Sequence, residues 1–192
     1  MKRFPKEQLG MTLIEMIIAI VLLGIAMTIF SSALIPPIKE ASSSHYQSRA
    51  VALGQSMMSQ ILSRNFDHNS DINGGWLRCG EEGAPDCSEL KADTDDGEST
   101  PATFNDVDDY IGCWFTSETK ANCPVGMPQY ALQDVIGLSA NDTYKNFRVQ
   151  VSVTEKTKDV NGEAIPKMRR VELQIFASNA QVMSLFGYRG NY

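Results

Sequence analysis

The sequence predicts an α+β fold, in which a long N-terminal helix packs on a C-terminal antiparallel β-sheet. Three observations lead to this fold class. Residues 16–35 carry no charge, residues 46–61 place apolar side chains at helical spacing, and residues 147–175 include two stretches of alternating apolar and polar side chains. The first two patterns are typical of helices, and the third is typical of strands.

The composition fits one compact domain with an appended segment. The 192 residues include 17 Lys and Arg against 23 Asp and Glu, a formal net charge of −6, and 43% of them are apolar. The apolar share argues against a wholly disordered chain, and the acidic balance disfavours nucleic acid as a partner. The only two histidines, His45 and His68, stand far apart in the sequence, which disfavours a histidine-based triad or metal site.

The first 35 residues predict a membrane segment with a cytoplasmic N-terminus. Lys2, Arg3 and Lys6 precede the uncharged residues 16–35. As a helix, these residues would span about 30 Å, the thickness of one bilayer core. The basic flank places the remaining chain across the membrane. A cleaved secretory signal would have a shorter apolar core, although residues 31–33 imitate its cleavage site.

Glu15 is the one charged residue in the apolar stretch 11–35. A carboxylate costs about 3 kcal/mol at the centre of a bilayer and less near its surface, so the surrounding apolar side chains still favour insertion. A plain membrane anchor, in which Glu15 is merely tolerated, leaves this residue unexplained. Cleavage after Gly10 would give Met11 a free α-amine with a pKa of about 8, and so a positive charge that can pair with Glu15.

Residues 6–15, KEQLG followed by MTLIE, resemble the cleavage and methylation motif of type IV prepilins. In that family a prepilin peptidase cuts after the glycine and N-methylates the new first residue. The resemblance implies cleavage between Gly10 and Met11, N-methylation of Met11, and pairing of the N-terminal amine with Glu15 during assembly. Most members have Phe where this chain has Met11. The resemblance also implies the pilin-like form of the α+β fold.

The same resemblance implies a location and a set of partners. The protein is expected in the inner membrane as a single-pass protein with a periplasmic head, and in the pilus after assembly. Expected partners are other pilins and minor pilins of the filament, the prepilin peptidase, the inner-membrane assembly machinery and membrane lipid, but no nucleic acid. The predicted parts are a leader peptide (1–10), a transmembrane and assembly helix (11–35), an amphipathic helix (36–66) and a head (67–192), which comprises a disulfide-bearing irregular region (67–146) and the sheet (147–192).

A second helical stretch follows the membrane segment. Pro36 and Pro37 predict a kink or break, because proline removes a backbone donor and clashes with the preceding turn. Residues 65–75 contain Asn73-Gly74-Gly75 and are expected to end the helix. Between them lies one apolar stripe, which we expect to cover one face of the sheet. The stripe consists of Tyr46, Ala50, Leu53, Met57 and Ile61.

The C-terminal region predicts the antiparallel sheet. Residues 147–154 and 170–175 alternate apolar and polar side chains, and the turn-rich residues 158–162 between them predict a hairpin. Residues 178–180 predict a second turn, after which 181–188 are expected to return as a third strand. Four apolar residues upstream are expected to cap an edge of the sheet: Leu132, Val135, Ile136 and Leu138.

The four cysteines, Cys79, Cys87, Cys113 and Cys123, lie close together in the sequence. Outside the cytoplasm an even number of cysteines predicts disulfides. Three pairings are open, and we favour the local ones, Cys79 with Cys87 and Cys113 with Cys123. A zinc site would need closer pairs or histidines, so no metal site is predicted.

The region around the cysteines is acidic. Residues 93–98, DTDDGE, resemble a fragment of a calcium loop, but the proper spacing and the terminal bidentate Glu are missing. Asp106, Asp108 and Asp109 add further carboxylates. We expect a solvated acidic loop and no cofactor, with calcium binding as the alternative.

The order of features in the middle of the chain resembles minor pilins of the mannose-sensitive haemagglutinin (MSHA) type. These features are RNFD at 64–67, two glycines, paired cysteines, DGE at 96–98, FNDVDDY at 104–110 and YRGNY at 188–192. The resemblance implies a low-copy subunit of a Gram-negative type IV pilus, involved in pilus biogenesis and cell adhesion.

Three other functions compete with this one. A minor pseudopilin of type II secretion would carry the same N-terminal motif. A membrane-anchored periplasmic enzyme or binding protein is disfavoured, because the sequence holds no nucleophile motif, glycine-rich phosphate loop or metal-ligand spacing, so no catalytic residue is expected. Trp76, Trp114 and Phe115 could stack on a ligand in an adhesive head, but aromatic residues beside cysteines more often pack on disulfides.

Overall fold

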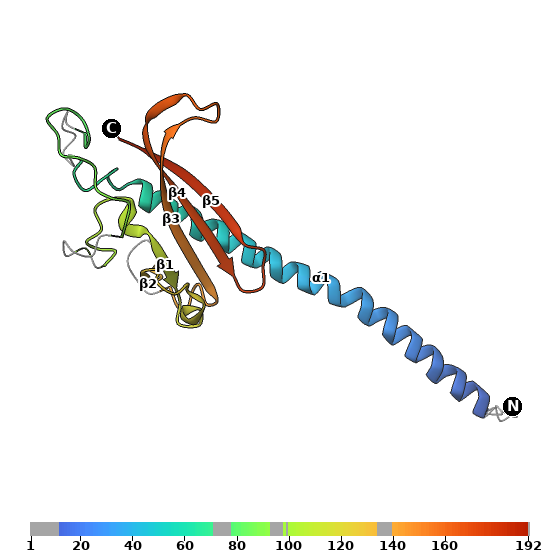
Figure 1. Ribbon diagram of the computed structural model, residues 1–192. Helices are drawn as coiled ribbons and strands as arrows, with labels where there is room; N and C mark the ends of the chain where they lie inside the picture. The colour runs from blue at the N-terminus through green and yellow to red at the C-terminus, as the bar shows by residue number, and fades with distance from the viewer. Residues whose placement is uncertain (1–11, 71–77, 93–97, 99, 134–139, 192) are drawn as a thin grey trace, which may run out of the picture. The chain divides into compact units, whose positions relative to one another are not determined.

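The computed structural model describes residues 12–70, 78–92, 98, 100–133 and 140–191, and the side chains of these residues outside 34–43. Its contacts divide the chain into two units, Met1–Ser44 and His45–Tyr192. We describe each unit by itself. From here on, the head means the second unit, His45–Tyr192, which includes the end of the long helix as well as residues 67–192. The elements are labelled in Figure 1.

The helix α1 begins at Leu13 and ends at Leu62. It continues through Pro36 and Pro37, so the predicted break at these residues is wrong. Proline fixes φ at a value that α-helices also have. A helix can therefore continue through a proline, although it loses the hydrogen bond that the missing backbone N–H would donate. α1 also ends short of the predicted boundary at residue 66.

In the first unit, Leu13–Ala33 forms an exposed apolar helix. Its mean hydropathy reaches 2.7, and its most apolar stretch is 0% buried. Within the described residues, it is the one helix that is long and apolar enough to cross a membrane, judged by length and composition. Contiguous apolar surface of this kind marks a contact with lipid or with other proteins.

The head contains a five-stranded sheet in the order β2-β1-β3-β4-β5. β1 pairs with β2 in parallel, and the other neighbours are antiparallel. The strands are β1 (Gly112–Phe115), β2 (Gln129–Ala131), β3 (Phe147–Lys158), β4 (Ala164–Ala177) and β5 (Met183–Gly190), with short 3₁₀ helices η1 (Asp108–Tyr110) and η2 (Lys120–Asn122). The predicted α+β, pilin-like architecture is confirmed.

The predicted hairpin is formed by β3 and β4. Its register runs from Phe147 opposite Ala177 to Lys156 opposite Met168. In the turn, one Asp159 carboxylate oxygen accepts hydrogen bonds from the backbone N–H groups of Asn161 and Glu163, each at 2.8 Å. β5 then returns antiparallel to β4, as expected for residues 181–188 after the turn at 178–180.

The core of the head lies between α1 and one face of the sheet. The predicted helical stripe is confirmed, since Ala50, Leu53, Met57 and Ile61 are all buried. Gly54 allows a close approach, because a Cβ here would lie 2.5 Å from the side-chain methyl carbons of both Ile175 and Leu185. The sheet side of the core is formed mainly by Val149, Val151, Val153, Val171, Leu173 and Ile175.

Part of the predicted irregular region is regular structure. The short strands β1 and β2 lie in it, and η1 precedes β1. Leu132, expected at an edge of the sheet, is buried in the core, whereas residues 135, 136 and 138 lie outside the described residues. A strand of three or four residues is too short to show a period of two, so this part of the prediction failed.

The aromatic residues of this region pack against one another. Trp114 is buried and stacks on Tyr110 with 5.6 Å between ring centroids, and Phe104 meets both rings edge to face. The indole N–H of Trp114 donates to the backbone carbonyl of Tyr110. A ligand-stacking role for Trp114 is therefore wrong. Trp76 lies outside the described residues.

Candidate functional site: the N-terminal segment and a buried charge network

The residues of the predicted assembly motif lie at the start of α1. Glu15 is in the first turn and exposed, and its backbone N–H donates to the backbone carbonyl of Thr12 at 3.1 Å. An acidic residue in the first turn is favoured by the helix dipole. Gly10 and Met11 lie outside the described residues, so their cleavage, the methylation of Met11 and its pairing with Glu15 stay predictions.

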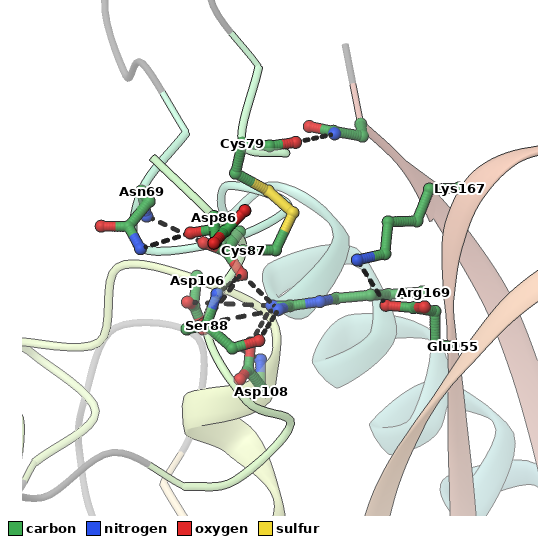
Figure 2. The surroundings of a disulfide bond; sticks show 12 residues. Asn69, Cys79, Asp86, Cys87, Ser88, Asp106, Asp108, Glu155, Lys167 and Arg169 are labelled. Atoms are coloured by element: carbon green, nitrogen blue, oxygen red, sulfur yellow. Dashed lines mark hydrogen bonds and ion pairs between the residues drawn. A yellow bond between two sulfur atoms is a disulfide. The ribbon is translucent and has the colours of Figure 1, made fainter. Parts of the chain in front are cut away.

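A second group of polar residues surrounds Arg169 of β4, inside the head. Arg169 is 1% exposed, and its two terminal nitrogens donate to the carboxylates of Asp67 and Asp108 (Figure 2). A third carboxylate oxygen, from Asp106, lies 3.9 Å from Nη1. The ring of Phe66 lies against the guanidinium, 4.8 Å from its carbon to the ring centroid. Arg169 thus joins the segments around residues 67 and 108 to β4, an inner strand of the sheet.

Asp67 is held in place by donors from two other segments. One carboxylate oxygen accepts the backbone N–H of Asn69 at 2.9 Å, and the other accepts the backbone N–H and the hydroxyl of Ser88 at 2.9 and 2.7 Å. Ser88 follows Cys87 directly, and Cys87 is bonded to Cys79 (Figure 2). The disulfide therefore fixes a loop that supplies donors to the carboxylate facing Arg169.

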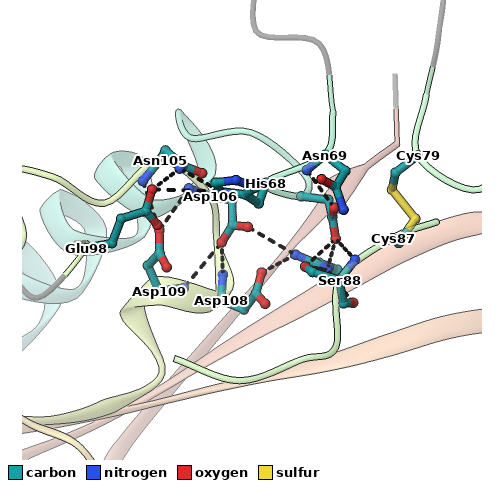
Figure 3. A network of polar contacts seen from close by, with 12 residues as sticks. His68, Asn69, Cys79, Cys87, Ser88, Glu98, Asn105, Asp106, Asp108 and Asp109 are labelled. Atoms are coloured by element: carbon teal, nitrogen blue, oxygen red, sulfur yellow. Dashed lines mark hydrogen bonds and ion pairs between the residues drawn. A yellow bond between two sulfur atoms is a disulfide. The ribbon is translucent and has the colours of Figure 1, made fainter. Parts of the chain in front are cut away.

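Asp106, Asp108 and Asp109 form a folded turn rather than a solvated loop. Asp106 accepts the backbone N–H of Asp108 at 3.0 Å, and Asp109 accepts those of Asn105 and Asp106 at 2.8 and 3.1 Å (Figure 3). All three aspartates are buried, so the expectation of a solvated acidic loop is wrong here. The cause is the turn's own backbone donors together with Arg169, which sequence order alone does not bring near.

Burial changes the acidity of this cluster. Burial raises the pKa of Asp108 to about 9. A hydrogen bond from the protonated Asp108 side chain to Asp106 and the negative charge of Asp106 act in the same direction, and Arg169 opposes them. Burial and the neighbouring Asp109 carboxylate raise the pKa of Glu98 to about 7, and burial also raises the pKa of Asp109. Asn105 donates its side-chain amide to Glu98 (Figure 3). Near neutral pH this cluster therefore holds protons that exposed carboxylic acids would have lost.

The structure pairs the cysteines locally. Cys79 bonds to Cys87 and Cys113 to Cys123, with Cα–Cα distances of 4.8 and 5.8 Å. The favoured pairing is therefore the one found. Asp67 lies beside the first disulfide, but the sulfurs of that pair are bonded to each other and offer no thiolate to a metal. Residues 93–97 of the calcium-like fragment lie outside the described residues.

Sequence reasoning did not find Arg169, Asp67 or Ser88. A signal for Arg169 was present, because the alternation of β4 places residue 169 on the same face as Val171 and Leu173, which is the core face. A charged residue at a core position predicts a buried ionic partner. Nothing in the sequence indicates that the partner is Asp67, which is 102 positions away.

The comparisons with known proteins bear on the N-terminus. Residues 5–31 match the model of a prokaryotic N-terminal methylation motif. This motif indicates a type IV pilin-like or pseudopilin protein, a class of structural subunits that are cleaved by a prepilin peptidase and assemble with other pilins. The exposed apolar helix fits a membrane-anchored member of this class. No curated protein and no solved structure matched the chain.

Proposed function

We propose that the protein is a minor, pilin-like structural subunit of an MSHA-type type IV pilus, with a role in pilus biogenesis and thereby in surface attachment. The observation that carries the proposal is the methylation motif at residues 5–31, which leads directly into an exposed apolar helix with Glu15 in its first turn. The MSHA assignment rests on the order of the loop features, which resembles that of the minor pilin MshD.

In this proposal the helix Leu13–Ala33 has two successive surroundings. It lies first in the inner membrane, with the head in the periplasm, and then packs among the helices of other pilins in the filament. Exchanging apolar lipid for apolar protein changes little in burial, so a specific polar contact has to set the register. Glu15 supplies that contact by pairing with the methylated amine of Met11, on its own or a neighbouring subunit, and such a pair acts as a registry device.

The N-terminal peptide tests this proposal. Mass spectrometry of the protein from membrane and pilus fractions is expected to find a first residue of N-methylated Met11. A protein that keeps residues 1–10, or that is cut near Ala33, contradicts it. Co-purification with the type IV pilus supports a pilin, whereas co-purification with a type II secretion filament shows that the protein is a pseudopilin and overturns the MSHA assignment.

The variant Glu15→Ala tests the registry role. It is expected to enter the membrane normally, because it removes a charge from an apolar segment. Its incorporation into pili is expected to fall roughly tenfold or more, because loss of one ionic contact of about 1.4 kcal/mol gives that factor. Incorporation is measured by immunoblotting sheared pili against the membrane fraction. The control Glu15→Asp keeps the charge and is expected to retain part of the incorporation, and normal incorporation of Glu15→Ala contradicts the role.

A further inference from the structure

A polar pocket lies on the outer face of the sheet, at the end where β3 begins and β4 ends. Its volume is about 390 Å³, within the range of small-molecule sites. In the strand register Arg148 stands opposite Phe176, on the face that alternates with the core residues Val149 and Ile175. The lining includes Thr119, Asn122, Asn146, Arg148, Phe176 and Ser178.

Arg148 is a buried cation without a counter-ion among the described residues. It is 9% exposed, and its guanidinium stacks on Phe176 at 3.8 Å from the central carbon to the ring centroid. Its Nη1 is buried with no hydrogen-bond partner. Burial lowers the pKa of Arg148, and no neighbouring carboxylate counteracts this effect. Glu118 lines the same pocket but forms no ion pair with Arg148.

The contrast with Arg169 gives this observation its weight. Arg169 is also buried, but two carboxylates accept its hydrogen bonds and a third lies within 3.9 Å. Burying a charged group without a partner costs far more free energy than burying a paired one. An unpaired guanidinium at the wall of a pocket therefore indicates an anionic group that is supplied from outside the chain.

The walls of the pocket are fixed by the surrounding structure. Asn146 and Ser178 have positive φ angles of 69° and 51°, and they are the described non-glycine residues with this conformation. The backbone N–H of Ser178 donates to the carbonyl of Asn146 at 3.0 Å. Thr119 donates its hydroxyl to the carbonyl of Phe147 at 2.9 Å. Strained backbone of this kind is concentrated at binding sites.

The segment that carries Asn122, the last residue of the 3₁₀ helix η2, is held as well. Cys123 follows Asn122 directly and is bonded to Cys113 of β1, so this segment is anchored to the sheet both by the disulfide and by its chain connection to β1. A site with fixed walls needs little ordering when a ligand binds. The pocket is thus arranged before any ligand arrives.

We propose that this pocket binds an acidic monosaccharide of the uronic acid type, with the sugar carboxylate on Arg148. A planar guanidinium matches a carboxylate through two parallel hydrogen bonds. The amides of Asn122 and Asn146 each offer a donor and an acceptor, which is what sugar hydroxyls require. A single cation beside the Glu118 carboxylate suits a monoanion better than a doubly charged phosphate. The inference concerns the head alone and does not depend on the proposed role in a pilus.

The test uses the full chain in detergent micelles and isothermal titration calorimetry. Galacturonate is expected to bind at least about tenfold more tightly than galactose, its neutral counterpart, because it alone can pair with Arg148. Arg148→Ala is expected to remove this preference, and Arg148→Lys to weaken it, because lysine lacks the planar fork. The control Arg170→Ala changes an arginine outside the pocket and is expected to leave binding unchanged.

Several outcomes overturn the proposal. They are the absence of saturable galacturonate binding by the folded protein, equal binding of galactose, unchanged binding by Arg148→Ala, and equal or tighter binding of acetate or inorganic phosphate. If Arg148→Ala fails to fold, Asn122→Ala is the deciding variant, because Asn122 is exposed at the end of η2. It is expected to weaken galacturonate binding severalfold, and unchanged binding by a folded Asn122→Ala contradicts the site.

Discussion

The two units of the chain distribute polarity in opposite ways. In Leu13–Ala33 the apolar side chains are exposed, and the one carboxylate, Glu15, is exposed with them. In the head the apolar side chains are buried, and Arg169 is buried with its carboxylate partners. The apolar surface of the first unit is thus available to lipid or to other proteins. In the head, by contrast, the charge of a buried side chain is neutralised by other side chains of the same unit.

This difference predicts that variants in the two units lose different properties. A change in the head is expected to alter the free energy of unfolding, because the interactions there are made within the chain. A change in Leu13–Ala33 is expected to alter location or assembly and to leave the stability of the head as it was. The following variants test that separation, beginning with the largest effect.

Arg169→Met is expected to have the largest effect. It removes a hydrogen bond to Asp108 and leaves the Asp67 carboxylate buried without its cation, and removing one partner of a buried ionic group costs about 3–5 kcal/mol. The melting temperature is therefore expected to fall by roughly 10 °C. The control Arg170→Met removes a half-exposed ion pair with Glu172, worth less than about 1 kcal/mol. Thermal unfolding followed by circular dichroism compares the two, and equal losses contradict the internal role of Arg169.

Leu23→Arg tests the opposite unit. A charge near the middle of the apolar segment costs about 3 kcal/mol of insertion free energy. The fraction that resists carbonate extraction from membranes is expected to fall, while the melting temperature of the head stays within about 1 °C. Leu23→Ala serves as the control and is expected to extract like the original protein. A lower melting temperature of Leu23→Arg would show that a change in the first unit also affects the stability of the head.

The double variant Cys79→Ser, Cys87→Ser is expected to cost about 2.5 kcal/mol in the chain-entropy model. Without the disulfide, the unfolded chain regains the conformational entropy that closing a loop with a sequence separation of 8 had removed. The hydrogen bond from Ser88 to Asp67 is also expected to weaken, because Ser88 is then less well fixed. Urea unfolding measures the loss. An unchanged transition midpoint shows that the disulfide does not support the Arg169 network.

Glu98→Gln is expected to have the smallest effect and to depend on pH. The folded pKa of Glu98 is about 7, above its ordinary value of 4.5, so its contribution to stability is full below pH 4.5 and is lost as pH rises through 7. Glutamine mimics the protonated form and removes this loss. The melting temperature at pH 8 is expected to rise by about 2 °C, with no change at pH 4. The exposed Glu81→Gln is the control, and a rise at pH 4 as large as at pH 8 contradicts the shift.

Local patterns predicted much of this fold. The helical stripe around Leu53 and the alternation after Phe147 each extend over many residues, so they exceed chance and indicate the correct element. β1 and β2 are too short to show a recognisable alternation of apolar and polar side chains. β2 forms a strand because it pairs in parallel with β1, which its own sequence does not indicate. Their positions follow from contacts that form only when the whole head is folded.

The site divides along the same line. The N-terminal motif is continuous in sequence and was therefore recognisable, together with Glu15. The Arg169 network joins residues near positions 67, 88 and 108, so its members are far apart until the chain folds. The acidic turn was predicted as solvated because the cation that faces it belongs to a strand much later in the chain.

The contact between Asp67 and Arg169 has a mechanical consequence. Asp67 lies shortly after the last residue of α1, and Arg169 lies in β4, a strand with a neighbour on each side. A tensile force applied along the helix can therefore be transmitted to β4 directly through the Asp67–Arg169 ion pair. The described residues between Asp67 and Arg169, which include both disulfide loops, then carry less of this force.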